Sequence, residues 1–331
     1  MSQPLSFVAW CLDDGVRMNS TSGGVFTALA EQILKRRGIV VGAAYDDRLN
    51  VRHEVVDSLE GLQRLRGVKY VHGSIGRDVY ERVRHALVDG KLVLATGLPC
   101  QIAAFRKSFG SPQNLLLCDL VCFGAPSHQI WRKYVEWMEQ KRGVRLKAIN
   151  PRDKKRGWGR KTYYRYEWQD GSVTRKCSTY DPYAQAFYSA LGFRRCCFSC
   201  AFRGVDRVSD ITLGDFWGAQ ALNLPEGVLK RGVSCVLVHT TLGRRFFDAA
   251  AVERRQVNVD VVLAENFPIV RSAGMPKQWE SYAADSQLMS FDALVTKYRL
   301  QVSRWQTCRR ILRNSIARVV PKVVKRILRH G

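Results

Sequence analysis

The chain has 331 residues, of which 46% are hydrophobic and 25% are charged, with ten cysteines and a net charge of +24. This length and composition are those of a globular protein of one large domain or two ordinary ones. No apolar run reaches the roughly 18 residues that a membrane helix needs, which excludes a membrane-spanning class. The positive charge favours a polyanionic partner such as nucleic acid, anionic lipid, an acidic protein or a phosphorylated small molecule.

The first residues, "MSQPLSFVAWCLDDGVR", lack the basic and apolar regions of a secretory signal, so a cytoplasmic location is expected. In that compartment, ten cysteines indicate metal binding, catalysis or simple burial more than a disulfide framework.

Strand and helix patterns alternate along the first two-fifths of the chain. Gly38 follows the first long helical pattern as its expected C-terminal cap, and Ser127 is an expected N-cap. Strands are predicted over 6–13, 39–46, 91–97 and 114–121, and helices over 23–38, 78–90, 101–110 and 127–143. Because unbroken apolar strands alternate with helices, we expect an α/β fold with a mainly parallel sheet and flanking helices.

The pattern changes after residue 146. Polar and aromatic residues alternate over 161–180 around Asp170 and Gly171, which predicts an inserted antiparallel hairpin region. One more strand and helix follow over 233–251. We therefore divide the chain into an α/β part (1–146), a part with the hairpin and a cysteine knuckle (147–292) and a basic tail (293–331).

The stretch "RRCCFSCAFRG" contains a Cys-x-x-Cys pair, Cys197 and Cys200, with the spacing of both zinc and iron–sulfur ligands. Sheet geometry suggests the missing partners. Cys100 and Cys122 each follow a predicted parallel strand, so both are expected at the carboxyl edge where α/β folds place their sites. An iron–sulfur cluster, a structural zinc and unliganded thiols all remain compatible with this spacing.

Ser22, Gly23 and Gly24 precede the first long helix. Hydroxyls and glycines at a helix N-terminus suit a phosphate, and they equally suit an ordinary serine cap. The turn has neither the Walker nor the Gly-x-Gly-x-x-Gly spacing.

Six motifs occur along the chain in the order in which a known protein family has them. They are "STSGGVFTALA", "LRGVKYV", "TGLPCQIA", "DLVCFGAPS", "PRDKKRGW" and "SDITLGDFWG", with the Cys-x-x-Cys pair between the last two. Over about residues 5–240 the chain resembles the coenzyme F420 hydrogenase/dehydrogenase beta-subunit family. That resemblance implies an iron–sulfur flavoprotein oxidoreductase that passes electrons between a 4Fe-4S cluster, FAD and a substrate. The substrate would be an F420-type deazaflavin or, in a bacterial branch associated with polysaccharide biosynthesis, an intermediate of that pathway.

The resemblance implies residues for both cofactors. The implied cluster ligands are Cys100, Cys122, Cys197 and Cys200. The implied FAD-binding residues are Ser22, Gly23, Gly24, Lys69, Tyr70 and Gly97. Cys196 lies outside the family pattern and is expected to face away from the cluster.

The chain departs from the family pattern at Leu98, Val68 and Phe123, each of which replaces a more polar residue. These departures motivate an alternative: a non-catalytic binding or scaffold protein in surface-polysaccharide biosynthesis. The cysteine run of the ferredoxin module that many relatives carry has no counterpart before Cys100, so a separate carrier, such as an acidic ferredoxin, is the expected electron donor.

No catalytic acid is assigned. Asp153, Lys154 and Asp215 lie in family-like motifs, with a surface salt bridge favoured for Lys154 and a turn cap considered for Asp215.

The tail has apolar residues at helical spacing between Ile311 and Leu328, with Arg and Lys between them and Pro321 as a kink. This pattern predicts a basic amphipathic helix, lying either on an anionic membrane surface or on its own domain. No recognised motif supports nucleic-acid binding.

Overall fold

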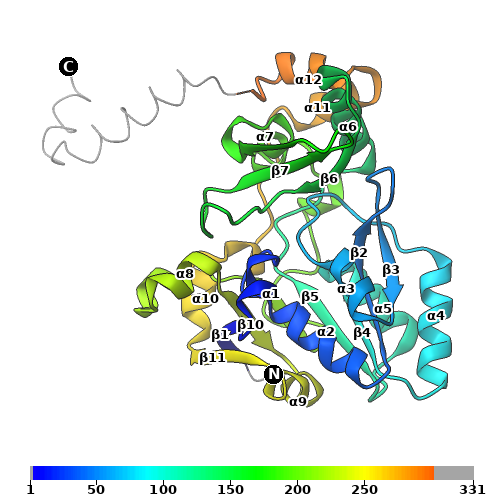
Figure 1. Cartoon of the computed structure of the whole chain (residues 1–331), viewed down its shortest axis with the longest axis vertical. Helices are drawn as coiled ribbons and strands as arrows, with labels where there is room; N and C mark the ends of the chain where they lie inside the picture. The colour runs from blue at the N-terminus through cyan, green and yellow to red at the C-terminus, as the bar shows by residue number, and fades with distance from the viewer. Residues whose placement is uncertain (1–2, 302–331) are drawn as a thin grey trace, which may run out of the picture.

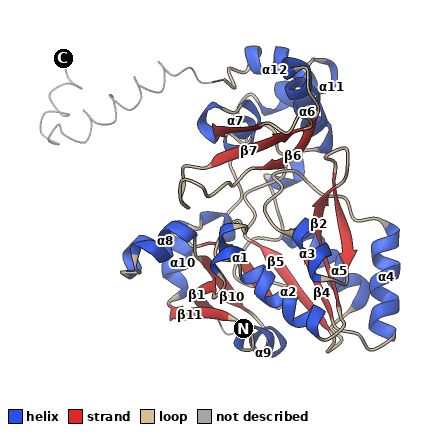
Figure 2. Ribbon diagram, viewed as in Figure 1, coloured by secondary structure: helices blue, strands red, loops and turns tan. Residues whose placement is uncertain are grey.

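The computed structural model describes residues 3–301, which contain an eight-stranded mixed sheet and a three-stranded antiparallel sheet (Figures 1 and 2). The order across the large sheet is β11 (Val252–Val257), β1 (Leu5–Cys11), β10 (Ser234–Val238), β9 (Ile211–Asp215), β5 (Leu115–Leu120), β4 (Val93–Gly97), β2 (Ile39–Tyr45) and β3 (Val51–Val56). The four strands β2, β4, β5 and β9 are parallel, and the strands outside them pair antiparallel. The predicted α/β class with a parallel centre is confirmed.

Successive residues of the central strands point to opposite faces, so an unbroken apolar strand supplies two apolar surfaces. Leu94 and Leu116 pack in the core of one face, and Ala95 and Leu117 pack in the core of the other. The first face is covered by α2 (Val25–Lys35), α3 (Leu59–Leu65) and α9 (Thr241–Asp248). The second face is covered by α4 (Arg77–Val88) and α5 (Pro99–Phe109).

Gly38 is not the cap of α2. The helix ends at Lys35, and the left-handed position is taken by Arg37, with a φ of 56°. Gly38 is required for another reason, since a Cβ there would lie 2.4 Å from the carbonyl oxygen of Leu92. Ser127 is the N-cap of α6 (His128–Arg142), as predicted.

The three-stranded sheet consists of β6 (Leu146–Asn150), β7 (Tyr163–Trp168) and β8 (Val173–Cys177). The predicted hairpin joins β7 and β8, and its Gly171 has a φ of 80°. This sheet shares one aromatic-rich core with α6 (His128–Arg142), α7 (Pro182–Tyr188), α11 (Trp279–Leu288) and α12 (Phe291–Lys297). In that core Tyr134 and Tyr166 both donate hydrogen bonds to the buried carboxylate of Asp181, at 2.8 Å each.

The remaining elements are short. They are α1 (Asp14–Met18), α8 (Glu226–Arg231), α10 (Val259–Glu265), η1 (Ser178–Tyr180), η2 (Arg195–Cys197), η3 (Ala219–Leu222) and η4 (Phe267–Ile269).

Among the described residues, no helix has the length and apolar character that crossing a membrane requires. The amphipathic helix predicted between Ile311 and Leu328 lies outside the described residues. The three-part division of the chain stays a prediction, and α12 extends across its boundary at residue 293.

Candidate functional site

The four predicted cluster ligands follow two strand ends and one short turn. Cys100 is the second residue of α5, which begins just after β4, and Cys122 follows the end of β5 by two residues. Cys197 is the last residue of η2, and Cys200 lies in the next turn. Because β4 and β5 are neighbouring parallel strands, Cys100 and Cys122 come to the same edge of the sheet.

The knuckle of residues 194–204 docks onto the turn that carries Cys122. The backbone N–H of Arg194 donates to the carbonyl oxygen of Ala125 at 3.3 Å, and Pro126 and Phe193 form an antiparallel bridge. At the other end of the knuckle, the guanidinium of Arg203 donates to the carbonyl oxygens of Cys122 and Phe123. The knuckle therefore holds the Cys122 turn from both ends.

The four thiols are close enough for a charge on one to raise the pKa of another. Burial raises the pKa of the Cys122 thiol to about 12; the charge of Arg203 opposes this shift, while Cys197, Cys100 and Cys200 add to it. Burial also raises the pKa of Cys100, with Arg194 opposing and Cys200 and Cys197 adding to the shift. Each thiolate would thus be destabilised by the others unless positive charge were placed among them.

Within residues 3–301, no three His, Cys, Asp or Glu side chains converge closely enough to form a metal-binding group as they stand. The four cysteines are neighbours that do not form a closed coordination shell. Their chemistry fits an iron–sulfur centre, because thiolates are the ligands that such clusters take. Arg194 and Arg203 supply nearby positive charge, which fits the same centre.

The adjacent cysteines of the knuckle differ in exposure. Cys196 is exposed, whereas Cys197 is buried, with 8% of its surface accessible. Cys11, Cys118, Cys177 and Cys235 are also buried. Cys196 is exposed, but its side chain interacts with the Cys197 thiol and raises the pKa of that thiol, so the expectation that it faces away from the other thiols stays a prediction.

The glycine turn packs tightly between β1 and β10. A Cβ on Gly23 would lie 2.5 Å from the carbonyl oxygen of Ala9 and 2.8 Å from the backbone nitrogen of Ser234, so no side chain fits. Gly24 is the N-cap of α2, with a φ of 83°, and no side chain caps the helix among the described residues. The hydroxyl of Ser22 donates to the carbonyl oxygen of Val233 at 2.6 Å and does not cap the helix.

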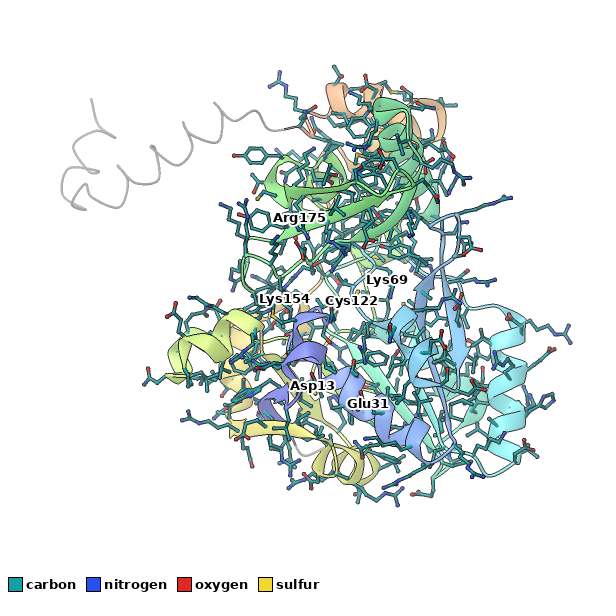
Figure 3. All side chains as sticks on the ribbon, viewed as in Figure 1. Asp13, Glu31, Lys69, Cys122, Lys154 and Arg175 are labelled. Carbon is teal, nitrogen blue, oxygen red and sulfur yellow. The ribbon has the colours of Figure 1, made fainter. Side chains whose placement is uncertain are left out.

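Lys154 holds this turn in place from a distant motif. Its ammonium group donates to the carbonyl oxygens of Arg17 at 2.5 Å, and of Ser22 and Arg231 at 2.7 Å each. The residue is buried, with 3% of its surface exposed, and burial lowers the pKa of its ammonium group to about 7. The surface salt bridge that we favoured for Lys154 is therefore wrong. Figure 3 labels Lys154 close to α1, to whose residue Arg17 it donates. Asp153 forms the motif's ion pair instead, with Arg175 at 2.7 Å.

Asp215 is the centre of a second connection between motifs. Its carboxylate accepts hydrogen bonds from Arg152 at 3.2 Å and from the indole of Trp158 at 2.9 Å. Arg152 also donates to the hydroxyl of Tyr70 at 3.3 Å. The turn cap considered for Asp215 is wrong; the residue pairs with a buried arginine. The hollow beside this network measures about 10 Å³, which has room for about one water molecule.

The predicted flavin-site residues Lys69 and Gly97 are fixed in different ways. The ammonium group of Lys69 donates to the carbonyl oxygens of Arg64, Leu65 and Arg66 at 2.9–3.1 Å, so it caps the C-terminus of α3. Gly97 is closely packed, since a Cβ there would lie 3.1 Å from Oε1 of Gln101 and 3.2 Å from Nε2 of His53.

Sequence reasoning missed His53. The side chain is 3% exposed, and its Nε2 has no hydrogen-bond partner among the described residues. A polar atom that is buried and unsatisfied beside a side-chain-free turn fits a site for a bound polar ligand. No motif surrounds His53 in the sequence, and only the sheet order, in which β2 alone separates β3 from β4, reveals that it lies near Gly97.

Two of the departures from the family pattern, Phe123 and Leu98, place apolar side chains next to the candidate cluster ligands. The Phe123 ring makes edge contacts with the rings of Phe187, Phe193 and Phe267, at centroid distances of 5.1–5.9 Å. Leu98 is the N-cap of α5, where its side chain offers no acceptor, and Gln101 accepts a hydrogen bond from its backbone N–H at 2.9 Å.

Two family profiles match the chain. Residues 6–76 match the profile of the N-terminal part of the coenzyme F420 hydrogenase/dehydrogenase beta subunit, and residues 90–262 match the profile of its C-terminal part. Among solved structures, one similar chain belongs to the F420-reducing [NiFe] hydrogenase complex from Methanosarcina barkeri. It has a TM-score of 0.51 and 17% sequence identity, and the match covers 90% of this chain and 93% of that chain. This likeness shows a shared fold. The comparison with curated proteins found no match. The first profile covers the glycine turn, and the second covers the four candidate cluster ligands. The chain belongs to the coenzyme F420 hydrogenase/dehydrogenase beta-subunit family.

Proposed function

We propose that this protein is an iron–sulfur flavoprotein oxidoreductase. The observation that carries the proposal is the docking of the knuckle with Cys197 and Cys200 onto the turn of Cys122, whose strand is the parallel neighbour of the strand before Cys100. These four thiols would hold a 4Fe-4S cluster, and the turns at Gly23-Gly24 and Gly97 would hold FAD. The bound cofactors would supply one-electron and two-electron transfer.

The chain's own residues orient and shield this chemistry. Arg203 fixes the backbone of the Cys122 turn, and Lys154 fixes the carbonyl of the glycine turn. Aromatic rings pack around Phe123, next to the half-buried Cys122. Nε2 of His53 is placed to accept or hold a proton at the Gly97 turn.

Because the family is named for coenzyme F420, we propose an F420-type deazaflavin as the first substrate to assay, followed by intermediates of polysaccharide pathways. An acidic electron carrier such as a ferredoxin fits the net charge of +24. We further propose a cytoplasmic location.

The test is anaerobic reconstitution of the full chain with iron, sulfide and FAD. The expected result is a brown-yellow protein with flavin absorbance, a broad iron–sulfur band and about four iron atoms per chain. A colourless protein after reconstitution would overturn the proposal.

The apolar packing of Phe123 and the apolar cap at Leu98 favour one second candidate, a non-catalytic scaffold that retains the fold. In that case, bound cofactors would remain oxidised with every donor offered. Reduction of the flavin by dithionite-reduced ferredoxin would exclude the scaffold role.

A further inference from the structure

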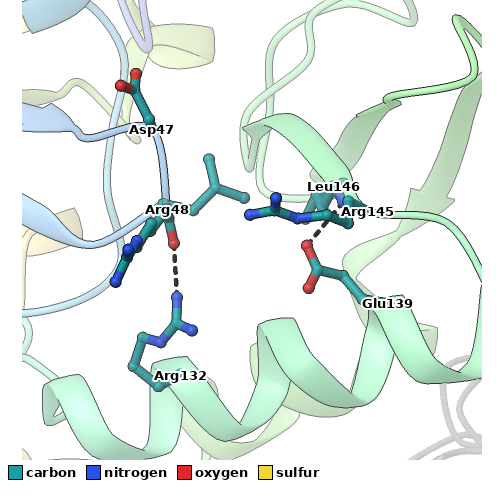
Figure 4. Close-up of a pocket in the computed structure, with 7 residues that line it drawn as sticks. Asp47, Arg48, Arg132, Glu139, Arg145 and Leu146 are labelled. Carbon is teal, nitrogen blue, oxygen red and sulfur yellow. Dashed lines mark hydrogen bonds between the residues drawn. The ribbon is translucent and has the colours of Figure 1, made fainter.

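A hollow of about 340 Å³ lies away from the cysteines, between the turn joining β2 to β3 and the junction of α6 with β6 (Figure 4). Its lining residues are Asp47, Arg48, Leu49, Arg132, Glu139, Arg145 and Leu146. The volume falls within the roughly 300–1,000 Å³ of small-molecule pockets. Neither the predicted cluster ligands nor the predicted flavin-site residues line it.

The walls of the hollow are fixed by hydrogen bonds to backbone groups. Arg132 donates to the carbonyl oxygen of Arg48, and the indole of Trp131 donates to that of Leu49, both at 2.6 Å. On the opposite side, the N–H of Leu146 donates to the carboxylate of Glu139 at 2.9 Å. The β2–β3 turn is thereby anchored on α6.

The β2–β3 turn also holds a strained residue. Leu49 is 4% exposed and has a φ of 58°, a left-handed conformation that a leucine rarely adopts. Such strain persists where surrounding contacts enforce it, and it is concentrated at binding sites. Here it directs the carbonyl oxygens of Arg48 and Leu49 toward α6.

Three arginines from three separate segments line the hollow, and in Figure 4 the side chain of Arg48 points away from Arg145. Arg132 has a carboxylate partner in Glu136, at 3.2 Å. The side chains of Arg48 and Arg145 are exposed and form no ion pair or hydrogen bond with a residue in the range 3–301, and the carboxylates of Asp47 and Glu139 also line the hollow. In Figure 4 the Arg145 side chain reaches across toward the Arg48 side of the hollow, while Glu139 is directed to the backbone of Leu146. The positive charge in the hollow is thus only partly compensated.

We propose that this hollow is a binding site for a phosphate-bearing small molecule. Guanidinium groups bind phosphate through paired, charge-assisted hydrogen bonds, and two of the three here are free within the described residues to make them. The polar walls and limited volume of this partly open hollow favour a small anion over a protein surface or an extended nucleic acid. The inference is independent of the proposed redox function, since no residue is shared.

The test is calorimetric titration of the full chain with inorganic phosphate at constant ionic strength, with variants that leave the proposed flavin-site residues unchanged. The double variant Arg48→Gln/Arg145→Gln removes the two free guanidinium groups. The matched control Arg36→Gln/Arg84→Gln removes the same charge from exposed positions elsewhere on the chain. Circular dichroism checks the fold, and Arg145→Gln alone serves if the double variant does not fold.

We expect saturable binding to the wild type and the control, with affinity at least about tenfold weaker in the double variant and in Arg145→Gln. Equal binding by all variants, or no saturable binding by the wild type, would overturn the site. Tighter binding of succinate than of phosphate would overturn the ligand class.

Discussion

The ammonium group of Lys154 donates a hydrogen bond to the carbonyl oxygen of Ser22 at 2.7 Å, across 132 positions of the chain. Two motifs that are remote in the sequence therefore form one structure. The same ammonium group reaches Arg17 and Arg231, so it satisfies backbone carbonyls on three segments at once. A buried lysine without a directly bonded carboxylate is costly, and its bonds to carbonyls offset that cost.

Replacing Lys154 with Met leaves three carbonyl oxygens without their donor. We expect the free energy of unfolding to fall by about 2–4 kcal/mol, from the cost of unsatisfied buried polar groups. Urea denaturation of the full chain measures this change. The control is Lys155→Met at the exposed neighbouring position, which should alter stability by less than about 0.5 kcal/mol. Equal loss in both variants would contradict the role assigned to Lys154.

The replacement Gly23→Ala tests the close approach of β1 and β10. Its Cβ would meet backbone atoms of Ala9 and Ser234, which can give way only if the strands separate. We expect a loss of about 2–3 kcal/mol, as overpacking of a core produces. At Gly274 no atom lies within 4 Å of a Cβ, so Gly274→Ala is the matched control and should leave the melting temperature almost unchanged.

The central strands could be predicted because fully buried parallel strands have unbroken apolar sequences. β4 and β5, "VLATG" and "LLLCDL", are of this kind. The direction of β1 and β10 could not be predicted, because an apolar run contains no information on whether its neighbour is parallel. β11, "VERRQV", was missed because this edge strand exposes its charged residues and shows no apolar alternation.

The placement of two candidate ligands at the end of neighbouring strands could be predicted from the sequence, while their role stays a prediction. Cys100 and Cys122 lie at one sheet edge because their strands are parallel neighbours. Lys154 was misjudged because a lysine in a charged stretch is normally solvated, and only tertiary packing surrounds this one with carbonyls. His53 was missed because its contact with the Gly97 turn depends on strand order.

Arg203 is expected to position the Cys122 turn. Its guanidinium donates to the carbonyl oxygens of Cys122, Phe123 and Pro268, so Arg203→Met leaves all three without this donor. We expect a loss of about 2–4 kcal/mol of unfolding free energy and less iron retained after reconstitution. The control is Arg195→Met, since Arg195 is exposed in the same knuckle. An unchanged free energy of unfolding in Arg203→Met would show that these three hydrogen bonds do not stabilise the fold.

His239 makes stability depend on pH. Burial, with a smaller contribution from Arg207, lowers the pKa of its imidazole to about 4, below the usual 6.5. The unfolded chain therefore binds a proton at a higher pH than the folded chain, and stability is lost as the pH falls from about 6.5 to about 4. The loss attributable to this group is on the order of 3 kcal/mol.

Urea denaturation at pH values between 7.5 and 4.5 measures this dependence. The variant His239→Gln should lose less stability over this range than the wild type. The exposed His85 provides the control, and His85→Gln should follow the wild-type profile. Parallel profiles for all three proteins would show that His239 is not held neutral by the fold.

The adjacent pair Cys196 and Cys197 gives the sharpest test of the ligand assignment, because the two thiols differ in exposure and lie one position apart. Cys197 is buried beside the other three candidate ligands, and its replacement by Ser removes one of four thiolates. We expect Cys197→Ser to lose most of its iron after anaerobic reconstitution, whereas Cys196→Ser should retain the wild-type content and the same broad absorbance band. Equal loss in both variants would mean that the knuckle binds metal in another arrangement. Equal retention would remove Cys197 from the ligand set, since an iron–sulfur cluster that lacks a thiolate is not held at full occupancy.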